Sequence, residues 1–300
     1  MHGRALRRSW QSGAVSLRES LANLFMLIKR KSIEAQANHK DGPGRKPVFS
    51  LPPKPARKIK YAPVTLSEQD GVRFLHFGTE WVQGAMRLRK PDWIELEYAQ
   101  QMMAWMLFID RPAHLVQLGL GTGALTKFCY RQFPEARVTA IELNPSVIAI
   151  CRSMFKLPED DSRLQVLEMD AQDFVDDHQR HESVDVMQID LYDATAKGPV
   201  LESVAFYQSC AACLTPDGMI TVNLFGDHPS YKRNLRAMQF VFDTVVCLPE
   251  VHDGNVVALA FKRRPVIDFG ELYAMAVGVV ESTRLPAKSW VNGIKQWIER

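Results

Sequence analysis

The sequence predicts an α/β domain in which helices cover both faces of a mostly parallel sheet. From residue 113 onward, short apolar runs alternate with segments of helical periodicity, the pattern of consecutive strand–helix units. The first apolar run leads into "QLGLGTGAL", where three glycines stand at alternate positions ahead of a helical segment. The last two runs flank "VHDGN" and are predicted to form a closing hairpin.

Each predicted element follows from its local composition. The strands are short apolar runs bounded by turn residues, and the helices carry apolar residues three or four positions apart. We expect strands at residues 114–120, 137–143, 164–170, 184–193, 218–225, 244–250 and 255–263. We expect helices at 124–133, 145–155, 171–177, 203–214 and 231–242, and Pro145 suits the first turn of the second helix.

Residues 1–60 differ from the rest of the chain in charge. They contain 14 Lys and Arg residues but 3 Asp and Glu residues, so a basic segment precedes an acidic body. From about residue 31 this segment has too few apolar residues to offset its chain entropy, and we expect a largely disordered tail. It has no apolar run long enough to span a bilayer, so no transmembrane segment is expected. It also lacks a recognisable nucleic-acid-reading motif, so no nucleic acid partner is expected.

The cysteines indicate a reducing compartment. Five cysteines are an odd number in a chain of 300 residues, which argues against a disulfide scaffold and predicts a cytoplasmic protein. Cys210 and Cys213 form a C-x-x-C inside a predicted helix, with no second pair and no histidine cluster nearby. No metal site is therefore expected.

The glycine-rich stretch predicts a turn that approaches a ligand closely. Gly119, Gly121 and Gly123 lie between the first strand and its helix, where the absence of a Cβ lets the backbone approach a bound group. The third glycine is displaced from the position that dinucleotide-binding turns use, and no Walker lysine follows. A nucleoside other than a dinucleotide or a triphosphate is therefore favoured.

Polar residues at the ends of the next strands fit such a ligand. Glu142 ends the second strand, where a carboxylate can accept hydrogen bonds from ribose hydroxyls. Asp170 ends the third strand and is followed by Ala171, in place to meet an adenine amino group. Asp190 ends the fourth strand, where we expect the sulfur atom of a nucleoside ligand. This arrangement resembles the fold of S-adenosylmethionine-dependent methyltransferases.

Five segments narrow the resemblance to one family. "QLGLGTGAL", "AIELNPSVIAICRSMF", "RLQVLEMDAQDFV", "DVMQIDLYDA" and "FYQSCAACLTPDGMITVNL" together resemble the spermidine synthase (polyamine aminopropyltransferase) family, in particular its bacterial spermidine-synthase-like branch. The resemblance implies a Rossmann-like, seven-stranded methyltransferase-type sheet with a small N-terminal β-hairpin domain. The expected divisions are a tail at 1–60, the hairpin domain at 61–92, the nucleoside-binding catalytic domain at 93–265 and C-terminal helices at 266–300.

The resemblance also implies roles for particular residues. Asp190 would be the catalytic carboxylate, and Asp193, in "DLYD", a second carboxylate that binds the amine. Tyr98 would lie near the acceptor amine, and Gln83 would bind the donor nucleoside. The family uses decarboxylated S-adenosylmethionine as a co-substrate, with no permanently bound cofactor, and a polyamine such as putrescine as acceptor. Its members are commonly homodimers.

Thr122 departs from the family pattern. The family turn has an aspartate here that binds the donor's aminopropyl ammonium, and a threonine cannot form that charge-assisted hydrogen bond. Two alternatives therefore stay open: a methyltransferase that uses intact S-adenosylmethionine, and a nucleoside-binding protein without catalysis. Aminopropyl transfer is favoured because the resemblance covers both the hairpin domain and the sheet.

Overall fold

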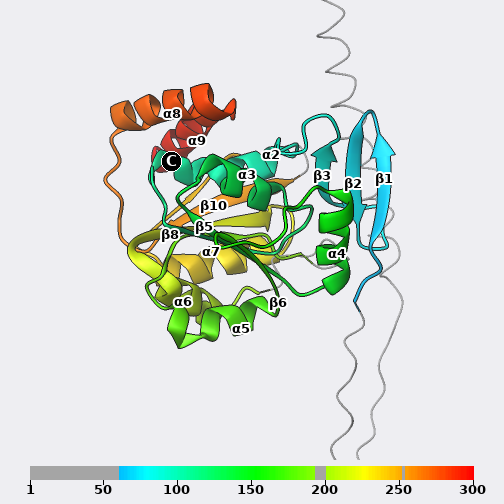
Figure 1. Ribbon diagram of the computed structural model, residues 1–300. Coiled ribbons are helices and arrows are strands. Elements are labelled where there is room, and N and C mark those ends of the chain that lie inside the picture. Colours follow the sequence, from blue (N-terminus) through cyan, green and yellow to red (C-terminus); the bar gives the residue numbers. More distant parts are fainter. Residues whose placement is uncertain (1–60, 193–200, 252–253) are drawn as a thin grey trace, which may run out of the picture. The chain divides into compact units, whose positions relative to one another are not determined.

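The structure, a computed structural model, describes residues 61–192, 201–251 and 254–300. The described residues from Pro63 onward form one compact unit (Figure 1). The predicted basic tail at 1–60 lies outside the described residues.

A small antiparallel sheet begins the described chain. Its strands are β1 (Thr65–Gln69), β2 (Val72–His76) and β3 (Val82–Arg87), with β2 in the centre. A tight turn at Asp70 and Gly71, both with positive φ, joins β1 to β2. This sheet is drawn in blue and cyan in Figure 1.

The main sheet has seven strands in the order β6-β5-β4-β7-β8-β10-β9. The first five in that order run parallel, whereas β10 is antiparallel to both β8 and β9. The strands are β4 (His114–Leu118), β5 (Arg137–Glu142), β6 (Leu164–Glu168), β7 (Val184–Ile189), β8 (Leu214–Phe225), β9 (Thr244–Cys247) and β10 (Asn255–Phe261). The predicted seven-stranded methyltransferase-type sheet is confirmed.

Helices pack on both faces of the main sheet (Figure 1). One face is covered by α2 (Glu97–Gln101), the 3-10 helix η1 (Met102–Leu107), α3 (Ala124–Gln132), α8 (Phe269–Thr283) and α9 (Ala287–Ile298). The other is covered by α5 (Ala171–Asp176), α6 (Val204–Cys213) and α7 (Ser230–Val241). The remaining helices are α4 (Pro145–Met154), which packs against β5 and β6, and the short η2 (His178–Arg180).

The alternation of side chains along each strand produces these two layers. In β4, Leu115 joins the hydrophobic cluster under α3, η1, α8 and α9, whereas Val116 joins the cluster under α5, α6 and α7. Successive side chains of a strand point to opposite faces, so a strand buried on both sides needs a continuous apolar run. That is why most residues of the runs from residue 113 onward are apolar.

All seven predicted strands differ in length from the structure: six end one to four residues earlier than predicted, and one begins four residues earlier. The run predicted at 218–225 starts at Leu214 in β8, because Leu214 pairs with Val184 ahead of an irregularity in the register. The run predicted at 244–250 is a strand only as far as Cys247, and Pro249 lies just beyond it. No helix in the described part of the chain is long and apolar enough to cross a membrane.

The order of the strands fixes where a site can form. The chain moves from β4 outward to β5 and β6, and then returns to place β7 on the other side of β4. Ligands in open α/β sheets bind beyond the carboxyl ends of the strands at such a reversal. The turn at Gly119–Gly123 after β4, which we call the glycine turn, and Asp190 after β7 both lie at this position.

Candidate active site

The turn after β4 needs glycine because it lies against the end of β7. Gly119 has a φ of 94°, a conformation that favours glycine. A Cβ at this position would overlap the main-chain carbonyl oxygen of Asp190. The glycine therefore lets the turn and Asp190 lie side by side, and Gly123, at the N-cap, leads directly into α3.

Glu142, the last residue of β5, stabilises the same turn. Its Oε2 accepts a hydrogen bond from Leu120 N at 3.1 Å, and its Oε1 accepts one from Asn144 N at 2.9 Å. Burial raises the pKa of the Glu142 carboxyl, and the backbone N–H donors oppose that shift. This carboxylate thus fixes the conformation of the turn, and a carboxylate has further acceptor positions for a ligand hydroxyl.

Strand β3 covers the turn through two residues. The Thr122 side chain is buried, and its hydroxyl donates to the carbonyl oxygen of Ala85 at 3.3 Å. A Cβ on Gly84 would lie 2.6 Å from Thr122 Cγ2. Gly84, which also lines the pocket, was not predicted, although a glycine inside a strand is a known signal of close approach.

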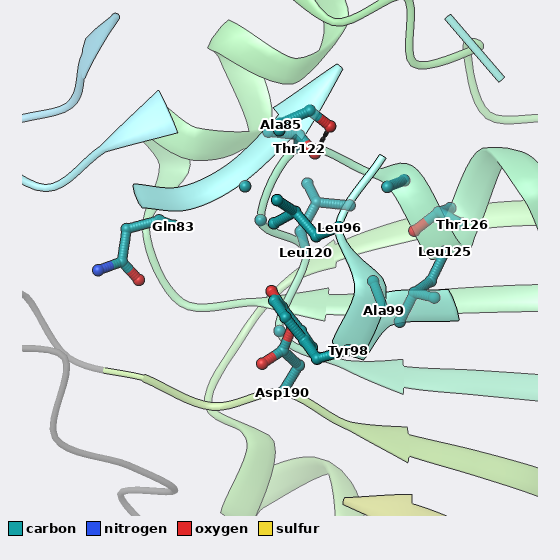
Figure 2. A pocket seen from close by; sticks show the side chains of 14 residues that line it. Gln83, Ala85, Leu96, Tyr98, Ala99, Leu120, Thr122, Leu125, Thr126 and Asp190 are labelled. Carbon is teal, nitrogen blue, oxygen red and sulfur yellow. Dashed lines mark hydrogen bonds between the residues drawn. The ribbon is translucent and has the colours of Figure 1, made fainter. Parts of the chain in front are cut away.

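Asp190 is held by donors from two elements. Tyr98, from α2, donates its hydroxyl to Asp190 Oδ2 at 3.2 Å. Asn223, from β8, donates through Nδ2 to Asp190 Oδ1 at 2.8 Å. Figure 2 shows the Tyr98 ring beside the Asp190 carboxylate, close to the glycine turn. Asn223 was not predicted, although asparagine is unusual in a strand that is otherwise apolar.

The structure brings six of the predicted site residues to one pocket. The residues that line it include Gln83, Tyr98, Gly119, Gly121, Thr122 and Asp190. In Figure 2 the Gln83 side chain is set apart from the pair formed by Tyr98 and Asp190.

The other predicted residues lie near the same edge or outside the described chain. Asp170 follows β6 and caps α5, where its Oδ1 accepts from Gln172 N at 2.8 Å. Ala171 is buried at the first position of α5. The residues that line the pocket include neither Asp170 nor Ala171. Asp193 lies outside the described residues.

The geometry of the pocket suits chemistry on a cationic amine. A carboxylate can bind an ammonium or take the proton of a reacting amine. The glycine turn beside it offers close approach of the backbone, and Leu96, Leu120 and Leu125 line the pocket with apolar surface. A polar reacting end and an apolar wall are typical of small-molecule sites.

The seven-stranded sheet, in which the last strand of the chain, β10, runs antiparallel to both of its neighbours, defines a methyltransferase-type α/β protein. A model of the spermine/spermidine synthase domain matches residues 100–269. A polyamine aminopropyltransferase of Neisseria meningitidis is 34% identical over 210 residues, covering 69% of this chain and 79% of the relative. The chain belongs to the spermine/spermidine synthase family, which confirms the resemblance seen in the sequence and makes the protein a transferase.

Solved structures of other proteins have a similar fold. A probable spermidine synthase from Corynebacterium glutamicum has a TM-score of 0.63 at 18% identity, covering 81% of this chain and 95% of that one. Human methyltransferase-like protein 13, solved with SAH, has a TM-score of 0.55 at 22% identity, covering 64% of this chain and 94% of that one. At these identities the likeness establishes the fold alone. This fold occurs both in the spermidine synthase and in the methyltransferase-like protein.

Proposed function

We propose that the protein transfers the aminopropyl group of decarboxylated S-adenosylmethionine to a diamine such as putrescine. The observation that carries this proposal is the Asp190 carboxylate, held by Tyr98 and Asn223 directly beside the glycine turn. Family membership supplies the reaction class, and the pocket supplies a carboxylate at the place where an amine would meet a sulfonium.

The proposed reaction is a displacement at carbon. The nitrogen of the neutral amine attacks the aminopropyl carbon next to sulfur, the carbon–sulfur bond breaks, and the sulfonium becomes the neutral thioether of methylthioadenosine. Asp190 holds the amine and takes or relays the proton that the new ammonium releases. Orientation of amine and sulfonium by the pocket supplies much of the rate.

The other predicted residues have supporting roles in this proposal. Glu142 and Asp170 would accept hydrogen bonds from the donor nucleoside, beside Ala171, and Gln83 would contact it from β3. Tyr98 and Asp193 would bind the acceptor amine. An acidic protein body attracts such a cationic substrate at long range.

Assembly and location belong to the same proposal. All five cysteines are free thiols, which suits a reducing compartment, and we infer a cytoplasmic enzyme. The family resemblance suggests a homodimer, and sedimentation of the purified chain tests this directly.

One observation favours a second candidate, methyl transfer from intact S-adenosylmethionine. Thr122 is uncharged, and its hydroxyl is engaged by Ala85, so it gives no anionic partner to a decarboxylated donor. Methyl transfer to an acceptor would release S-adenosylhomocysteine instead of methylthioadenosine.

The deciding experiment incubates the purified protein and putrescine with each donor and identifies the products. Methylthioadenosine and spermidine support the proposal, whereas S-adenosylhomocysteine with a methylated product supports the second candidate. Asp190→Asn is expected to lower kcat by at least about 100-fold, because the amide cannot accept the proton. Asp217→Asn is the matched control, because the Asp217 side chain is 90% exposed and lies outside the pocket. Absence of either product, with neither donor bound in calorimetry, contradicts both enzyme candidates.

A further inference from the structure

Three polar residues lie in a row across neighbouring strands of the main sheet. Asp190 directly follows β7, Asn223 lies in β8, and Asn255 is the first residue of β10. Asn255 pairs with Phe225, which is two residues beyond Asn223 in β8. Residues two positions apart in a strand share a face, so Asn223 and Asn255 are diagonal neighbours on one side of the sheet.

Hydrogen bonds connect the three side chains in one direction. Asn255 donates through Nδ2 to Asn223 Oδ1 at 2.7 Å, and Asn223 donates through Nδ2 to Asp190 Oδ1 at 2.8 Å. Asn223 is 2% exposed and Asn255 is 8% exposed. The amides are thus shielded from water that could replace either hydrogen bond.

The chemistry of the groups fixes this direction. An ionised carboxylate only accepts hydrogen bonds, so Asn223 must turn its NH₂ group toward Asp190. Its oxygen then faces Asn255, which must supply an NH₂ group in turn. Asp190 therefore sets the orientation of Asn223, and the NH₂ group of Asn255 supports that same orientation.

We propose that Asn223 and Asn255 are positioning residues that hold the Asp190 carboxylate toward the reacting amine. Asn223 occupies Oδ1 and Tyr98 occupies Oδ2, so the two donors together fix the rotation of the carboxylate. Asn255 donates to Asn223, and it acts on the Asp190 carboxylate through Asn223 by keeping that amide in its donating orientation. The proposal rests on the catalytic role proposed for Asp190.

Two substitutions of similar size at Asn255 separate positioning from packing. Asn255→Leu removes the donor but leaves Asn223 free to keep its NH₂ group toward Asp190. Asn255→Asp introduces an acceptor, which attracts the Asn223 NH₂ group and turns the Asn223 oxygen toward Asp190. Because this turn removes a hydrogen bond to a charged group, N255D is expected to lower kcat by about 10–100-fold at pH 9. The KM for the donor nucleoside should change by less than about threefold, and N255L should lose at most about fivefold in kcat.

The pH dependence of N255D gives a readout that a purely structural role would not produce. At pH 6 the introduced buried carboxyl group takes up a proton and can donate again, so the kcat of N255D should recover toward that of N255L. All other titratable groups are common to the two variants, so the difference between their profiles reports the introduced group. Circular dichroism at both pH values shows whether each variant is folded.

Asn223→Leu keeps the proposal testable if N255D does not fold. This variant removes the donor to Asp190 without adding a charge, and its kcat should fall by about 10–100-fold. Equal kcat for N255L and folded N255D at pH 9, or an N223L variant within threefold of the wild type, would overturn the positioning role. A wild-type protein that releases no methylthioadenosine would instead refute the proposed function, so the two failures are distinct.

Discussion

Tyr98 donates its hydroxyl to Asp190 Oδ2 at 3.2 Å, although 92 positions separate the two residues in the chain. The contact joins α2, which precedes the main sheet, to the end of β7 in its centre. A phenol and a carboxylate from separate elements therefore meet at one wall of the pocket, the place that we propose for the acceptor amine.

Tyr98→Phe tests the importance of this hydrogen bond. The substitution keeps the ring and removes the donor, so we expect kcat for aminopropyl transfer to fall by about 10-fold or more. The free energy of unfolding should change by less than about 1.5 kcal/mol, because Tyr98 is half-buried. Steady-state kinetics with putrescine and urea unfolding measure the two effects. A kcat within twofold of the wild type would remove Tyr98 from the proposed site.

Gly119→Ala tests the close approach of the turn to β7. The new methyl group would overlap the Asp190 carbonyl oxygen at a positive φ, and we expect a loss of about 2–4 kcal/mol in unfolding free energy. Gly71→Ala is the matched control, because Gly71 has a φ of 75° but nothing within 4 Å of the added Cβ. It should lose only about 1 kcal/mol and keep its activity. Equal losses in the two variants would show that the contact with Asp190 has no energetic effect.

His114 predicts an acid dependence of stability. The ring is 6% exposed, and burial lowers the pKa of His114 from 6.5 to about 4. Between pH 6.5 and 4 the unfolded chain therefore binds a proton that the native protein does not, so stability falls as the pH falls, by about 3 kcal/mol in total. His114→Asn should lack this component in urea unfolding measured across that range. Parallel pH profiles for wild type and variant would contradict the prediction.

Lys127 predicts a dependence of stability on pH in the alkaline range. It is 1% exposed, and its Nζ donates to the carbonyl oxygens of Pro91 at 2.8 Å and Phe155 at 2.7 Å. Burial lowers the pKa of Lys127 from 10.5 to about 8. Between pH 8 and 10.5 the unfolded chain binds the extra proton, so the wild-type stability should rise with pH by about 3 kcal/mol relative to Lys127→Met. A constant difference between the two proteins across this window would contradict the assigned shift.

The architecture could be predicted from the sequence because local signals coincide with the global fold. Runs such as 114–118 are buried on both faces of the sheet. A strand buried in this way needs mostly apolar residues, and this is visible in its composition. The turn at Gly119–Gly123 and the proline at the start of α4 are likewise encoded by single residues. Strand ends were less predictable, because pairing with Val184 extends β8 back to Leu214.

The site could be predicted only in part because its remaining members depend on register. Asn223 and Asn255 become neighbours only when β8 and β10 pair with Asn255 opposite Phe225. Gly84 acquires its role from the approach of β3 to Thr122: a glycine inside a strand signals a close approach, but it does not tell which residue comes close. Glu142 was predicted to bind a ribose. The sequence does not reveal that its two oxygens also accept hydrogen bonds from the backbone N–H groups of Leu120 and Asn144.

The five free thiols have a practical consequence for studying this enzyme in solution. All of them are buried, burial raises their pKa values, and Cys151 donates to the Gly121 carbonyl oxygen at 2.8 Å beneath the glycine turn. Because alkylating reagents attack exposed thiolates, the native cysteines should stay unmodified in the folded protein. A single cysteine placed at Gln83 could then carry a fluorophore, and donor binding could be followed by emission without a cysteine-free background.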